Sequence, residues 1–119
     1  MGHSSSMTRI IVLFAAVAAF GCSDSGVSPP AAPTNLLVAP LGAGAHLTWS
    51  DNSMDELEFA ILRQEMGVDP AMAEIASVPF NGVSFHDEPI NAGATYVYQV
   101  IATNEGGDAG SNAVTFDAP

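Results

Sequence analysis

The segment TYVYQVIATN, residues 95–104, carries the clearest structural pattern in the chain. Successive residues of an extended strand point to opposite faces, so every second side chain lies on the same face. In this segment one such face is aromatic or aliphatic throughout, and its members are Tyr96, Tyr98, Val100 and Ala102. The alternation therefore predicts a strand with one face in a hydrophobic core.

The same period-two alternation continues over most of the chain from Thr34 onward. Its short runs are separated by clusters of Gly, Pro, Asn and Asp, which is typical of an all-β sandwich. Leu47 and Trp49, for example, share one face and can pack into a core between two layers. We expect seven strands, approximately at Asn35–Ala39, Ala45–Ser50, Glu58–Glu65, Ala73–Ser77, Ser84–Asp87, Thr95–Asn104 and Ala113–Phe116.

This region resembles a fibronectin type III domain. The stretch LTWSDNS at 47–53 is similar to the family's second strand, with Trp49 at the core-tryptophan position, and INAGATY at 90–96 is similar to the turn before its sixth strand. The resemblance implies a seven-stranded, immunoglobulin-like β-sandwich. It also implies that the hydroxyl of Tyr96 bonds to nearby backbone as a tyrosine corner, with Gly93 supplying backbone freedom. We therefore expect structural roles for Trp49, Tyr96 and Gly93.

The start of the chain resembles a bacterial lipoprotein signal peptide. Arg9 precedes an unbroken apolar run, Ile10 to Phe20, of 11 residues (20 − 9). A membrane-spanning helix needs roughly 20 residues, whereas this length suits a signal-peptide core. The run ends at Ala19-Phe20-Gly21-Cys22, which resembles a lipobox and implies a diacylglyceryl group on Cys22 and cleavage before it. An ordinary signal peptide that leaves Cys22 as a free thiol is the alternative.

The sequence thus predicts three segments. Residues 1–21 are the leader and signal peptide, residues 22–33 a flexible Ser/Gly/Pro linker, and residues 34–119 the folded domain. The resemblance implies an exported protein anchored by lipid to the cell envelope. Ser23 follows the cysteine where, in some bacteria, aspartate is the inner-membrane retention signal, so the outer membrane is slightly favoured.

The charge of the chain excludes several partners. The net charge is −11, and past Cys22 it is −12, because Arg63 is the one basic residue against 13 acidic ones (1 − 13). Such a surface repels nucleic-acid phosphates and anionic lipid headgroups. Attachment to a membrane therefore requires a covalent anchor or an apolar segment. A single cysteine also excludes an intrachain disulfide.

We find no residue pattern for catalysis, a cofactor or a structural metal. No serine stands in a GxSxG context, and His46 and His86 lack metal-ligand spacing. Carboxylates gather in two loops expected at one end of the sandwich, namely Asp51, Asp55, Glu105 and Asp108. Turn chemistry explains such residues, and a specific calcium site is the less favoured alternative.

Two surfaces are candidates for binding. The first is this acidic loop set, in which the glycine-rich segment from Asn104 to Gly110 is expected to be flexible. The second is the outward face of the third and sixth strands, where Leu62, Val97 and Ile101 form an apolar patch unless a neighbouring strand or loop covers them. We expect a non-catalytic module for protein binding or adhesion in the cell envelope. The alternatives are a spacer without a ligand and a polysaccharide-binding accessory.

Overall fold

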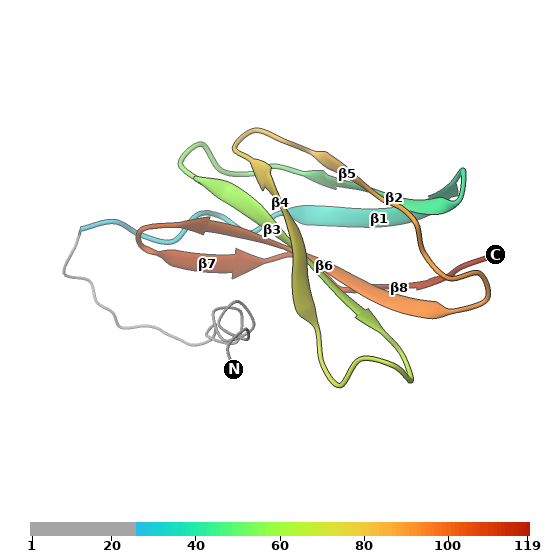
Figure 1. Ribbon diagram of the computed structural model, residues 1–119. Coiled ribbons are helices and arrows are strands. Elements are labelled where there is room, and N and C mark those ends of the chain that lie inside the picture. The colour runs from blue at the N-terminus through green and yellow to red at the C-terminus, as the bar shows by residue number, and fades with distance from the viewer. Residues whose placement is uncertain (1–25) are drawn as a thin grey trace.

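The computed structural model describes residues 26–119, which form strands and no helix (Figure 1). Residues 1–25, including Cys22, lie outside the described part. Within residues 26–119 no helix is long and apolar enough to span a membrane. The strands in chain order are β1 (Thr34–Leu41), β2 (Gly44–Ser50), β3 (Glu58–Glu65), β4 (Ala73–Pro79), β5 (Ser84–Asp87), β6 (Thr95–Asn104), β7 (Gly107–Gly110) and β8 (Val114–Asp117).

These strands form two antiparallel sheets. One sheet has the order β1-β2-β5, and the other has the order β4-β3-β6-β7, with β8 also paired to β6. The strand β6 is therefore central to the larger sheet, as expected for its strongly alternating sequence. The predicted all-β sandwich is confirmed.

Residues 26–119 form eight strands where seven were predicted, and the additional strand is β7. Gly107–Gly110 lies in the segment expected to be a flexible loop, but it pairs with β6 from Asn104 to Ile101. The break between β7 and β8 falls at Ser111. Its N–H donates to the carbonyl of Val100 at 2.8 Å, and its hydroxyl accepts from the N–H of Val100 at 3.0 Å. The Ser111 side chain thus takes the place of a backbone acceptor for the N–H of Val100. The segment that pairs with β6 is therefore divided into β7 and β8.

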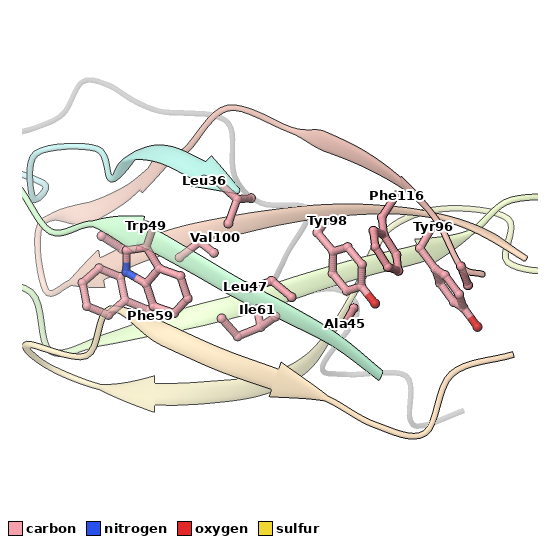
Figure 2. Packing of buried hydrophobic residues seen from close by; sticks show 12 residues of the cluster. Leu36, Ala45, Leu47, Trp49, Phe59, Ile61, Tyr96, Tyr98, Val100 and Phe116 are labelled. Carbon is pink, nitrogen blue, oxygen red and sulfur yellow. The ribbon is translucent and has the colours of Figure 1, made fainter. Parts of the chain in front are cut away.

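The core fills the space between the sheets (Figure 2). Trp49 and Phe59 pack against each other at one end, with ring centroids 5.6 Å apart, and Tyr96 and Tyr98 lie toward the other. Burying an aromatic or branched aliphatic side chain contributes about 1.5–3 kcal/mol. Other members of this core are Leu36, Ala45, Leu47, Ile61, Val100, Ala102, Phe116 and Ala118.

The sandwich has two ends, which we name from the start of the described chain. The proximal end carries residues 26–33, the loop 51–57, the turn 80–83 and the β6–β7 turn (Figure 1, left). The distal end carries the β1–β2 turn, the loop 88–94 and the C-terminus (Figure 1, right), together with the β3–β4 turn (Figure 1, bottom).

A buried polar cluster joins the two sheets near the distal end. Asp87 of β5 accepts a hydrogen bond from the hydroxyl of Tyr98 at 2.6 Å and forms an ion pair with Arg63 of β3 at 3.0 Å. The guanidinium group of Arg63 also lies over the ring of Tyr96, 5.4 Å from its centroid. Burial raises the pKa of Tyr98, and the hydrogen bond to Asp87 raises it further, so the hydroxyl remains a donor at ordinary pH.

We predict that Asp87→Ala lowers the free energy of unfolding by about 3 kcal/mol, because it leaves Arg63 and the Tyr98 hydroxyl without their shared acceptor. Urea unfolding followed by the fluorescence of Trp49 measures this change. Glu105→Ala is the matched control, since it removes one negative charge from an exposed position. Equal stability of the two variants would contradict a structural role for the cluster.

Candidate functional site

The segment before β1 lies against the proximal end. Of the predicted linker, residues 22–33, the structure describes the part from Gly26. Within it Pro33 is fully buried. The Nδ2 group of Asn104 donates to the carbonyl of Ser28 at 3.0 Å, and the Nδ2 group of Asn52 donates to the carbonyl of Ala32 at 3.0 Å. The chain is therefore bound to two loops of the domain before it enters β1.

Glycine at position 106 makes this contact possible. A Cβ atom at Gly106 would overlap the carbonyl oxygen of Val27 and lie 2.6 Å from the carbonyl carbon of Ser28. The N–H of Gly106 also donates to the side chain of Asn104 at 2.6 Å. The glycine-rich sequence here thus allows two backbones to approach closely, a common use of glycine.

The loop 51–57 contains an acidic pair that is partly inside the protein. Glu56 is 5% exposed, and its Oε2 atom accepts from the N–H of Asn81 at 3.0 Å. Burial raises the pKa of Asp51, and the neighbouring Glu56 adds to the rise. Burial acts in the same direction on Glu56, but hydrogen bonds, led by that from Asn81, outweigh it and lower its pKa. These bonds hold the loop 51–57 against the turn 80–83.

The structure brings the two predicted acidic loops to the same end. Asp51 and Asp55 lie in the loop 51–57, and Glu105 and Asp108 lie in the β6–β7 hairpin. Asn104 links the loops, because its Nδ2 group also reaches the carbonyl of Asp55 at 3.4 Å. Within residues 26–119 no three carboxylate, histidine or cysteine side chains are placed to hold a metal ion.

The second candidate surface is largely covered. Leu62 faces away from the core cluster, yet it is only 5% exposed, and Val97 and Ile101 are half-buried. Leu62 lies opposite Glu74 on one neighbouring strand and Gln99 on the other. Both neighbours have long side chains that can lie over an apolar residue. The outer face of β3 and β6 is therefore not an open apolar patch.

The residues with expected structural roles lie in the core or at the turn beside it. Trp49 is buried in the core. The hydroxyl of Tyr96 accepts a hydrogen bond from the N–H of Asn91 at 2.8 Å, the geometry of a tyrosine corner. Between these two residues Gly93 has φ +80°, a left-handed conformation that favours glycine.

A set of exposed apolar side chains at the proximal end was not predicted from the sequence. Two come from the loop 51–57 and two from the turn 80–83, namely Met54, Leu57, Phe80 and Val83. A hydrogen bond from the N–H of Asn81 to Glu56 holds these two connections beside each other. The signal available in the sequence was an apolar residue on each side of the Asn81-Gly82 turn.

This topology and core are shared with known structures. A solved structure described as a myokine is 27% identical, with a TM-score of 0.64 over 76% of this chain and 98% of that chain. A fibronectin type III domain of human collagen XX is 18% identical, with a TM-score of 0.63 over 84% of this chain and 100% of that chain. The fold is that of a fibronectin type III domain. No protein-family model and no curated protein matches the sequence.

The chain is also similar to parts of larger proteins. The chain aligns with part of the pectate lyase PelI from Erwinia chrysanthemi, at 24% identity and a TM-score of 0.62. This alignment covers 71% of the chain but 28% of the lyase. At this identity the similarity establishes a shared fold and not a shared activity.

We predict that Gly106→Val displaces residues 27–32 from the β6–β7 turn, because the new side chain would occupy the space of Val27 and Ser28. Backbone NMR order parameters at Val27, Ser28, Ala31 and Ala32 should fall, with those of β3 and β6 unchanged. Glu105→Val, an exposed neighbouring position, is the control and should leave these order parameters unaltered. Unchanged order parameters at these four residues in the Gly106 variant would contradict the prediction.

Proposed function

We propose that the protein is an exported lipoprotein of the bacterial cell envelope whose fibronectin type III-like domain binds another envelope component without catalysis. The observation that carries the proposal is the lipobox-like sequence ending at Cys22, placed a few residues before a segment that is docked on the domain. A lipid on Cys22 would hold this domain directly at a membrane. Two or more acyl chains suffice for stable anchoring.

The composition of the domain supports binding rather than chemistry. Its one arginine, Arg63, is already paired with Asp87, so it is not available to stabilise a developing negative charge. A polysaccharide ligand is less favoured, because sugar-binding platforms present exposed aromatic rings. Among the described residues the aromatic rings lie mainly in the core, and Phe80 is the strongly exposed one.

The partner that fits best is a protein. The acidic surface disfavours nucleic acid and leaves room for a partner with complementary positive charge. The distal end offers exposed apolar side chains in two separate turns, Leu41 at the β1–β2 turn and Met66 and Val68 at the β3–β4 turn, and a protein partner can bury either set. A spacer without a ligand is the alternative function.

We predict that the protein extracted from membranes has the mass of a chain that begins at Cys22 and carries lipid. Cys22→Ser removes the thiol that accepts the lipid, so the variant should leave the membrane fraction. Intact-mass spectrometry and fractionation measure both effects, with Ser23→Ala as the matched control. A membrane-extracted mass that retains residues 7–21 and lacks lipid would disprove the anchor.

Crosslinking in intact cells separates a binding module from a spacer. With a photoreactive residue at Leu41 or Val68, we expect one crosslinked product of defined mass. It should fade when unlabelled protein is present in excess, because a specific site is saturable. A photoreactive residue at Thr48, exposed on the three-stranded sheet, is the control. Products that are diffuse and insensitive to competition at all three positions would favour the spacer.

A further inference from the structure

The proximal end carries an apolar rim that the fold does not use. We define the rim as Met54, Leu57, Phe80 and Val83, which are exposed side chains on two adjacent connections. Met54 is 99% exposed, so it contributes almost nothing to the folded core. Exposed apolar groups that cluster in this way typically mark a site of contact with another molecule or a membrane.

The path of the chain indicates what this rim meets. Val27 and Ser28 lie against Gly106 at the same end of the sandwich, and the side chain of Asn104 binds the carbonyl of Ser28. Cys22 precedes Val27 by five residues (27 − 22). Even a fully extended chain of this length spans at most about 18 Å. A lipid on Cys22 therefore keeps the proximal end close to the bilayer surface.

The distal end is in a different position. It also carries exposed apolar residues, Leu41, Met66 and Val68, but the described chain does not begin there. The described residues extend 47 Å along their longest axis, which is far more than the reach from Cys22 to Val27. Exposed apolar residues occur at both ends and do not indicate which end faces a membrane. The position of Cys22 along the chain, close to the proximal end, does indicate it.

The charge of the proximal end limits the kind of membrane surface it can meet. Asp55 and Glu105 are exposed there, so anionic headgroups would repel this end. Attachment has to come from the acyl chains on Cys22. Apolar side chains of the rim can then enter the interfacial region of a bilayer with zwitterionic headgroups.

We infer that the proximal end rests on the bilayer, with Met54 and Phe80 of the rim in contact with lipid and the distal end directed away. This orientation depends on the proposed lipid on Cys22. It assigns the acidic loops around Asp55 and Glu105 to the membrane side. The surface that remains open to a protein partner is then the distal end.

The test uses the acylated protein with a single introduced cysteine. Cys22 is the one natural cysteine, so once it carries lipid the new thiol is the only one that reacts with a label. Met54→Cys reports on the rim, and Val68→Cys, at a position 69% exposed on the distal end, is the matched control. Each is labelled with a fluorophore and reconstituted into phosphatidylcholine vesicles that contain a nitroxide-bearing lipid.

We expect the nitroxide lipid to quench the label at position 54 several-fold more than the label at position 68. Equal quenching, or stronger quenching at position 68, would overturn the inferred orientation and leave the lipoprotein intact. Energy transfer between labels at position 54 that persists when the protein is diluted with excess lipid would show a second copy on the rim, which also overturns it. If the unsubstituted protein reacts with the label and fails to float with vesicles, the proposed lipid anchor itself is wrong.

Discussion

Asp87 places the small sheet on the large one. Its carboxylate accepts a hydrogen bond from Tyr98 of β6 and forms an ion pair with Arg63 of β3, both in the large sheet. Its own strand, β5, pairs with β2 in the small sheet. A carboxylate in so buried a position is costly unless its oxygens have partners, and removing one partner leaves that cost uncompensated. Arg63 is the one strong cation past Cys22, and this cluster uses it. The cluster therefore fixes the spacing of the sheets at the end of the core where Tyr96 forms its corner.

The strands with alternating sequences could be predicted, because burying one face of a strand requires an apolar residue at every second position. For β6, all positions from Thr95 to Asn104 were expected and found. The strand β7 was not expected, since its four residues include two glycines and no apolar stripe. Its pairing depends on the neighbouring strand and on the Ser111 hydroxyl, which replaces a backbone acceptor. Neither of these is visible as a local pattern.

The candidate surfaces show a different limit of sequence reasoning. Period two correctly directs Leu62 away from the core, but it does not tell what lies across the sheet from it. The cover comes from residues on two other strands, so exposure is a tertiary property. The burial of Glu56 and the ion pair of Asp87 also depend on residues from other strands and turns, so the sequence did not predict them. The two acidic loops, in contrast, were expected at one end because the fold fixes which connections meet.

If Cys22 carries the proposed lipid, the contact between the N-terminal segment and the proximal end fixes the orientation of the domain as well as its distance from the membrane. A tether through a flexible chain only limits distance, whereas a docked segment also limits rotation. Its two side-chain hydrogen bonds, from Asn104 and Asn52, contribute about 1 kcal/mol each. Together they favour the docked state about thirtyfold, and the burial of Pro33 adds to this. A domain this acidic gains nothing from charge attraction to a membrane. With the proposed lipid in place, the direction of the domain relative to a membrane would depend on the close approach of Val27 and Ser28 to Gly106, which any larger residue at position 106 would prevent.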